Sequence, residues 1–195
     1  MIKKILTITT VFIFLFVLHF NAYKIAWKLN SPLIIKIAKI FNAPINQENL
    51  ISKIIAQYKF GCVRDKQTRS IIKLLVSYDF SVNSLDDRKV LSPLAAVSRC
   101  LDVEFVKLFL EHGADPNYKT PYGSYPHHLA IEGSGNRSLK IIKLLDNHGG
   151  KLHLSDSYGR TCLDISKDSY DSNFNYDNWS LVIKYLEEYN NLIKK

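Results

Sequence analysis

The residues of this chain that could hold a metal or transfer a proton are its six histidines and three cysteines. His127 and His128 are adjacent, and a histidine pair near a cysteine could bind a metal or activate a thiol. Neighbours on a helix point about 100° apart, so we do not expect these two rings to share one metal ion. An enzyme built on this pair and a cysteine such as Cys100 is kept as an alternative hypothesis.

The cysteines offer no recognisable metal motif. Cys62, Cys100 and Cys162 are odd in number and have neither a CxxC pair nor zinc-site spacing. A bridge between Cys62 and Cys100 is geometrically feasible in an oxidising compartment, but we favour three small core residues.

Signatures of common catalytic sites are missing. The sequence has no glycine-rich phosphate loop, no GxSxG elbow, no HExxH pair and no acidic cluster with metal-ligand spacing. We therefore expect no enzyme activity, no metal and no cofactor.

The elements that must position these residues form a repeat. Residues 103–117 and 138–153 each run from an apolar helix face into a His-Gly pair, and segments 71–75 and 182–186 share the same apolar pattern. Gly113 and Gly149 fall where each helix should end in the left-handed conformation, and Asp79 takes that place in the first unit. Asn83 and Asn117 match each other in the turn that follows. A period near 33 residues indicates a stack of helical units.

Three segments open these units: 92–97 (Ser-Pro-Leu-Ala-Ala-Val), 125–130 (Tyr-Pro-His-His-Leu-Ala) and 161–166 (Thr-Cys-Leu-Asp-Ile-Ser), which start 33 and 36 residues apart. They resemble the Thr-Pro-Leu-His-x-Ala pattern of ankyrin repeats. The resemblance implies an all-α fold, an ankyrin solenoid of about four helix-turn-helix units with β-turn tips over residues 51–195. The outer units fit less well: 58–63 keeps only the apolar places, and 168–178 reads as an insertion with Tyr170, Phe174 and Tyr176.

The resemblance also suggests structural roles for four histidines. His112 and His148 precede the terminating glycines, where family-typical histidines make helix-end hydrogen bonds or pack. His128 matches the pattern's histidine, which braces a turn, whereas His127 replaces its leucine and should point inward.

Charge is concentrated at the N-terminus. Residues 1–60 hold eight lysines and one acidic residue, Glu48, whereas 61–195 hold 18 basic and 17 acidic residues. The repeat region is therefore near neutral and carries no recognised nucleic-acid motif, so the pI of about 9.3 does not predict a nucleic-acid partner.

The N-terminus itself predicts a membrane or export segment. Residues 5–23 are 19 uncharged residues after Lys3 and Lys4, long enough to span about 28 Å as a helix preceding the repeats. We read residues 1–23 as a transmembrane anchor or a cleaved signal peptide, with a buried soluble helix as the third alternative. Lysines on both sides leave the orientation open.

Residues 24–50 read as a basic linker and capping helix. Lys36 and Lys39 lie on one face of an apolar helix over 33–41, which could cap the first repeat or lie on anionic lipid. A second helix, over 47–58, has an apolar stripe at core spacing.

The remaining candidate surface is the β-turn tips. Tyrosine and arginine are common at binding hot spots, and the tips supply six candidate partner-binding residues: Asp86, Arg88, Tyr118, Tyr122, Tyr158 and Arg160. We predict a protein–protein interaction module, membrane-anchored or periplasmic or secreted, such as an inhibitor or scaffold for an envelope protein. A secreted ankyrin effector is a further alternative, and the aromatic insertion is a second candidate surface.

Overall fold

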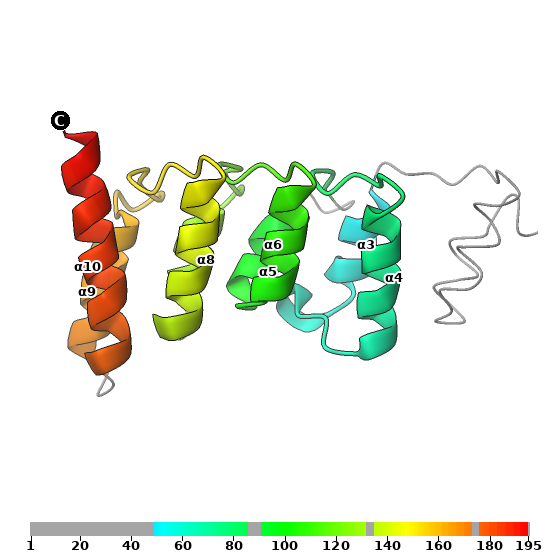
Figure 1. Ribbon diagram of the computed structural model, residues 1–195, viewed down its shortest axis with the longest axis horizontal. Helices are drawn as coiled ribbons and strands as arrows, with labels where there is room; N and C mark the ends of the chain where they lie inside the picture. Colours follow the sequence, from blue (N-terminus) through cyan, green and yellow to red (C-terminus); the bar gives the residue numbers. More distant parts are fainter. Residues whose placement is uncertain (1–48, 86–90, 132–134, 173–175, 195) are drawn as a thin grey trace, which may run out of the picture. The chain divides into compact units, whose positions relative to one another are not determined.

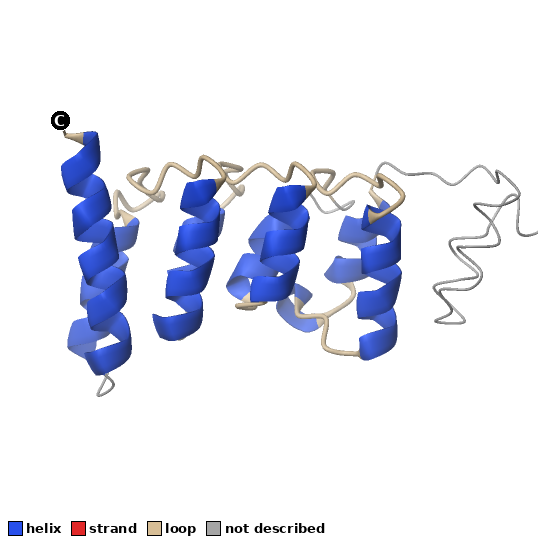
Figure 2. Cartoon of the chain, viewed as in Figure 1, coloured by secondary structure: helices blue, strands red, loops and turns tan. Residues whose placement is uncertain are grey.

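The computed structural model of this protein describes residues 49–85, 91–131, 135–172 and 176–194. Across these ranges the regular structure is helical and no strand is present, which confirms the predicted all-α class (Figure 2). The α-helices and their bounds are α3 (Leu50–Ala56), α4 (Lys66–Val76), α5 (Pro93–Arg99), α6 (Val103–Glu111), α7 (Pro126–Ile131), α8 (Gly135–Asn147), α9 (Cys162–Ser172) and α10 (Tyr176–Ile193). A short 3₁₀ helix, η1, spans Lys59–Gly61.

The N-terminal predictions lie outside the described residues. This applies to the hydrophobic helix over 5–23, the basic segment that follows it and the helix over 33–41. Among the helices that the structure does describe, none combines the length and hydropathy that a bilayer crossing requires.

The described chain separates into two compact units, one formed by 63–80 and the other by 49–62 together with 81–194. The smaller unit is α4 and its flanks. Asp65 caps α4 by accepting a hydrogen bond from the Thr68 N–H at 2.7 Å. Asp79 ends it in the left-handed conformation (φ 61°), and the Phe80 N–H then reaches back to the Leu75 carbonyl at 3.2 Å. The left-handed place predicted for Asp79 is confirmed.

The larger unit repeats a pair of antiparallel helices joined by a short turn. The pairs are α5–α6, α7–α8 and α9–α10, and their first helices begin at Pro93, Pro126 and Cys162. Helices α3, α5, α7 and α9 follow one another in one layer, while α6, α8 and α10 form the other (Figure 1). The first helix of each pair therefore begins at the second residue of the corresponding opening segment, in agreement with the predicted register.

Local chemistry explains where these helices begin. The Ser92 hydroxyl accepts from the Ala95 N–H at 3.2 Å, and Pro93 occupies the first turn, where its missing N–H costs nothing. The Asp102 carboxylate accepts from the Phe105 N–H at 3.1 Å at the start of α6. Phe105 and Phe109 stack in the core with ring centroids 5.6 Å apart. Each buried aromatic ring of this kind contributes roughly 1.5–3 kcal/mol.

Two asparagines tie successive turns together at the repeat period. The Asn83 side chain donates to the Gly113 carbonyl at 2.7 Å and accepts from the Asp115 N–H at 2.8 Å. Gly113 and Gly149 both have the predicted positive φ, at 78° and 83°. The predicted match between Asn83 and Asn117 is thereby given a role, because Asn117 makes the same two bonds one unit later.

Two sequence predictions about the outer segments need correction. In the polar stretch 168–178, residues 168–172 belong to α9 and residues 176–178 to α10, so a loop is wrong for these residues. Residues 58–63 do not open an α-helix; only the single turn η1 forms there. The helix predicted over 47–58 forms as the shorter α3, and its apolar residues are buried as expected: Leu50, Ile51, Ile54 and Ile55.

Candidate functional site

Two of the three predicted tips form tight turns in the larger unit. In the first, the Thr120 N–H donates to the Ser124 carbonyl at 2.8 Å and the Gly123 N–H to the Thr120 carbonyl at 2.9 Å. In the second, the Asp156 N–H donates to the Arg160 carbonyl at 2.9 Å. The two turns share one hydrogen-bond pattern 36 residues apart, so each presents its central residues in the same way.

The two turns lie against each other. The Ser157 hydroxyl donates to the Tyr122 carbonyl at 3.0 Å. Gly123 has φ +82°, and a Cβ added to it would lie 2.6 Å from the Ser157 Cβ. Glycine is therefore required at this position by conformation and by space.

Of the six predicted partner-binding residues, Tyr122, Tyr158 and Arg160 lie in these turns, and Tyr118 lies two residues before the first turn. Tyr122 and Tyr158 are 69% and 81% exposed, Arg160 is exposed, and Tyr118 is half-buried. Asp86 and Arg88 lie outside the described residues. We call Tyr118, Tyr122, Tyr158 and Arg160 the tip surface.

A buried carboxylate, which the sequence analysis did not select as a site residue, organises the second tip. Asp156 accepts from the N–H groups of Tyr158 (2.8 Å) and Arg160 (2.9 Å) and from the Arg160 guanidinium through Nε (3.1 Å) and Nη2 (2.9 Å). Burial alone raises the pKa of Asp156, but the hydrogen bonds from Arg160 outweigh this and hold that pKa below its ordinary value. Arg160 also lies 5.3 Å over the Tyr158 ring. The usable signal was the spacing Asp156-x-Tyr158-Gly-Arg160.

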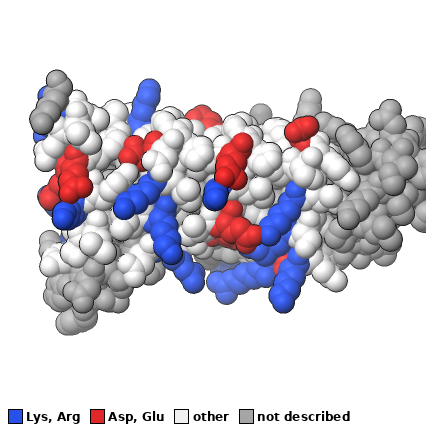
Figure 3. All heavy atoms as spheres, viewed as in Figure 1, with Lys and Arg blue, Asp and Glu red and all other residues white. Residues whose placement is uncertain are grey.

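Charge on the described surface is mixed. On the face in Figure 3, lysine and arginine side chains stand beside acidic ones. The predicted aromatic insertion contributes one half-buried tyrosine, Tyr170, to a shallow hollow of about 420 Å³ between α9 and α10. Lys167 and Glu187 pair across this hollow at 3.0 Å. Phe174 lies outside the described residues.

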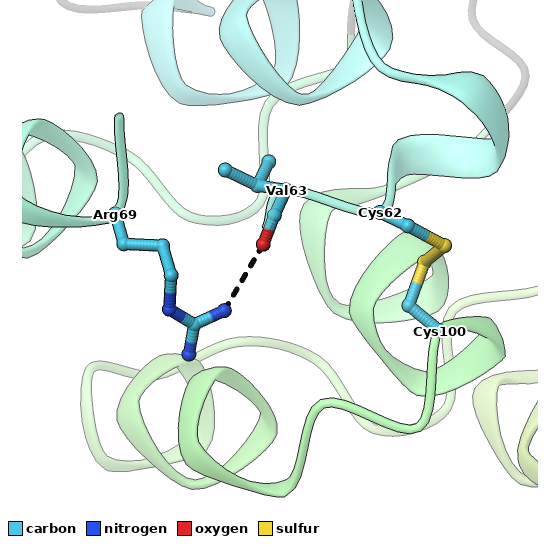
Figure 4. Close-up of a disulfide and its surroundings, with 4 residues drawn as sticks. All are labelled: Cys62, Val63, Arg69 and Cys100. Atoms are coloured by element: carbon cyan, nitrogen blue, oxygen red, sulfur yellow. Dashed lines mark hydrogen bonds between the residues drawn. A yellow bond between two sulfur atoms is a disulfide. The ribbon is translucent and has the colours of Figure 1, made fainter. Parts of the chain in front are cut away.

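A disulfide joins Cys62 and Cys100 at a sequence separation of 38, so the preference for three free core cysteines is wrong for this pair (Figure 4). Within the larger unit the bond links the chain after η1 to the end of α5. Closing a loop of that length stabilises a fold by about 3–4 kcal/mol.

Figure 4 also shows the Arg69 guanidinium donating to the Val63 carbonyl of the smaller unit at 3.1 Å. Cys162 is free and buried, as predicted.

The helix-end and turn roles predicted for the histidines are confirmed. His112 Nδ1 lies 2.8 Å from the Leu108 carbonyl, and His148 Nδ1 lies 2.8 Å from the Leu144 carbonyl. His128 Nδ1 accepts from the Tyr125 N–H at 3.2 Å and so braces the turn before α7.

His127 points inward, as predicted, and is fully buried. Although neighbouring positions on a helix point about 100° apart, the ring centroids of His127 and His128 are only 4.3 Å apart. Cys162 lies beside them, and one potential ligand atom from each of the three residues falls within 4.8 Å of the others. Burial and the neighbouring His128 lower the pKa of His127 to about 3, and burial raises the pKa of the Cys162 thiol.

No protein-family model matches this chain, and no curated protein is significantly similar to it.

Proposed function

We propose that this chain is an ankyrin-repeat protein that binds another protein through the tip surface and acts after export, either anchored by residues 1–23 or released from them. The observation that carries the proposal is the pair of adjacent, hydrogen-bonded turns, which present Tyr122 and Tyr158 to solvent. Exposed tyrosines on rigid turns supply contact area at low conformational cost.

Three features support the repeat architecture. Antiparallel helix pairs stack in two layers, their first helices begin at matching residues of the repeat, and Asn83 and Asn117 tie neighbouring turns at the repeat period. Gly113 and Gly149 end equivalent helices in the same left-handed conformation. Such arrays use their turn tips and first helices as binding surfaces.

Export is supported by the disulfide. Stable disulfides persist in oxidising compartments and are rare in a reducing cytosol. The Cys62–Cys100 bond therefore fits a repeat region that lies outside the cytosol, which is where an N-terminal anchor or signal would place it. The near-neutral repeat region supports a protein partner over a nucleic acid.

The alternative of a His/Cys enzyme receives little support from this geometry. A nucleophilic thiol needs a low pKa and access to substrate. Cys100 is bonded to Cys62, while Cys162 is 0% exposed and burial raises its pKa.

Photo-crosslinking in the cells that make the protein tests the binding proposal. A crosslinking amino acid at position 122 or 158 should trap one discrete partner, and the same probe at Lys140, on α8 in the other layer, should not. The purified partner should then bind the Tyr122→Ala/Tyr158→Ala variant at least about 30-fold more weakly, as expected for hot-spot residues. Arg160 is left in place because it neutralises Asp156. Equal trapping at all three positions, or unchanged affinity, would move the site elsewhere.

Cell fractionation tests export separately. Protease access to intact and permeabilised cells, together with the N-terminal sequence of the mature protein, distinguishes an anchor that retains Met1 from a signal cleaved near Tyr23. Full-length protein in the soluble cytosol would contradict both forms of the proposal.

A further inference from the structure

The strongest unexplained feature outside the tip surface is the cluster of His127, His128 and Cys162 in the larger unit. Their side chains are fully buried, with 0%, 2% and 0% exposure. The three potential ligand atoms lie within 4.8 Å of one another. Thiolate is a ligand that selects soft metal ions, and imidazole suits copper and zinc among others.

The chain's own repeat makes two of these residues exceptional. The three opening segments place Pro93, Pro126 and Cys162 at one equivalent position, the first residue of each helix. The next position holds Leu94 and Leu163 in the outer two segments but His127 in the middle one. Each of these two positions has one exceptional residue: Cys162 at the first and His127 at the second. The two residues belong to neighbouring repeats and lie close together in space.

Histidine at position 127 is energetically less favourable than the leucine at the equivalent position of the neighbouring repeats. Leu94, at the equivalent place, is 1% exposed and fills its site with apolar atoms. In His127 both ring nitrogens are buried and lack a hydrogen-bond partner, as does Nε2 of His128. Leaving such a group buried without a partner destabilises the folded state relative to one that is hydrogen-bonded. The carbonyls of Leu154 and Arg160 lie nearby and favour protonated rings, but neither reaches hydrogen-bond geometry with these nitrogens.

Charge selects the class of ion. A thiolate with neutral imidazoles carries one negative charge, so a monovalent cation leaves the buried site neutral. A divalent ion would leave one uncompensated positive charge away from water, which is expensive. Asp156, the carboxylate whose charge acts on His128, already pairs with Arg160 at 2.9 Å and does not balance a second charge. Sulfur and imidazole ligands with one net charge fit Cu(I).

We propose that His127 and Cys162 are the primary ligands of a buried soft monovalent metal ion, Cu(I) by its chemistry, with His128 beside them as the third group. The ion replaces the thiol proton of Cys162, which leaves to solvent, and no electron is transferred. His128 Nδ1 accepts from the Tyr125 N–H, so in the metal-free protein the single proton of this neutral ring resides on Nε2. The ring can complete the site through Nε2 only when that proton moves to Nδ1, which ends the hydrogen bond from Tyr125 and leaves the ring neutral. With bonds as long as those of zinc, about 2.3 Å to sulfur and 2.0 Å to nitrogen, a sulfur and a nitrogen on one ion lie at most about 4.3 Å apart. The sulfur of Cys162 and the His127 nitrogen lie within 4.8 Å of each other, so they need to close by at most about half an ångström.

Ag(I) is the probe of choice, because it is soft and monovalent and needs no reductant, so the Cys62–Cys100 disulfide stays closed. The full chain is unfolded without reductant, refolded with Ag(I) and freed of excess ion on an exchange resin, which avoids dependence on an entry path to a buried site. We expect one Ag(I) per chain, with silver–thiolate absorption. At free Ag(I) 100-fold above Kd, the melting temperature should rise by roughly 5–10 °C.

Two variants identify the ligands. Cys162→Ser should remove this binding, and His127→Leu, which installs the residue of the neighbouring repeats, should fold and bind Ag(I) at least about 30-fold more weakly. His148→Gln removes an exposed histidine from the chain and should bind as the parent does. Zn(II) under the same protocol should bind at least about 100-fold more weakly than Ag(I).

Several outcomes would overturn the proposal. Absence of retained Ag(I) in the refolded parent excludes the site. Equal binding by Cys162→Ser places the ion elsewhere in the chain, and equal binding by His127→Leu reduces the site to a lone buried thiol. Tighter binding of Zn(II) would refute the charge argument that selects a monovalent ion.

Discussion

The side chain of Asn117 clamps the turn that contains Gly149: its amide donates to the Gly149 carbonyl at 2.9 Å, and its oxygen accepts from the adjoining N–H of Lys151 at 2.8 Å. The same arrangement joins Asn83 to Gly113, 34 residues earlier. A single side chain thus satisfies both a donor and an acceptor of the next turn.

Asn117→Ala should lower the free energy of unfolding by about 1–2 kcal/mol, because two hydrogen bonds are lost and two backbone groups lose their partners. Urea unfolding followed by circular dichroism measures this. Asn191→Ala, at an exposed helical position in α10, is the matched control and should change stability by less than about 0.5 kcal/mol. Equal effects of the two substitutions would mean that the clamp contributes nothing specific.

Breaking the disulfide gives a second prediction. The Cys62→Ala/Cys100→Ala variant should lose about 3–4 kcal/mol of stability, because the unfolded chain regains the freedom of a 38-residue loop. The parent protein, denatured without reductant, should show one reactive thiol, that of Cys162. Three reactive thiols in protein isolated under oxidising conditions would contradict the bond and remove the main structural support for export.

The helix ends and turn clamps could be predicted because their causes are local. Gly113 and Gly149 mark left-handed positions by residue type alone, and Asp79 could be placed by register because Asp is tolerated in that conformation. The exposure of Tyr122 and Tyr158 could be predicted because the repeat pattern places both residues at turn tips.

The His127–Cys162 contact could not be predicted, because it depends on how two neighbouring repeats stack and not on spacing within either one. The Cys62–Cys100 pair was recognised as feasible but not preferred, since an odd number of cysteines without a motif does not fix a pairing. The polar composition of residues 168–172 predicts a loop. In the structure these residues continue α9, which ends at Ser172 and packs against α10.

Asp156 should make the free energy of unfolding depend on pH. Its pKa in the folded protein lies below the ordinary value, so its stabilising effect is complete above the unfolded pKa and is lost as the pH falls through the folded pKa. Unfolding free energy should therefore decline as the pH falls through the ordinary aspartate pKa of about 3.9 and below it. Asp164, whose pKa is lowered chiefly by hydrogen bonds from Thr161, contributes in the same window.

Asp156→Asn isolates the first of these contributions. The amide keeps the shape but loses the charge that pairs with Arg160, so we expect a loss of about 2–3 kcal/mol at pH 7 and a shallower decline toward low pH. Urea unfolding at a series of pH values measures both. A variant that is destabilised equally at every pH would show that the loss does not come from the charge of Asp156.

The contact between the two tips is tested by a matched pair of glycines. Gly123 and Gly113 have nearly the same backbone conformation, φ +82° and +78°, so alanine strains both by about 1–2 kcal/mol. Only at position 123 does the added methyl meet another group, because Ser157 Cβ would be 2.6 Å away, whereas nothing lies within 4 Å at position 113. Gly123→Ala should therefore be the more destabilising, by about 1–3 kcal/mol, as for overpacking. It should also weaken partner binding, because it separates Ser157 from the turn that presents Tyr122, while Gly113→Ala binds normally once folded. Equal stability losses in urea unfolding would mean that the two turns are not in contact in solution.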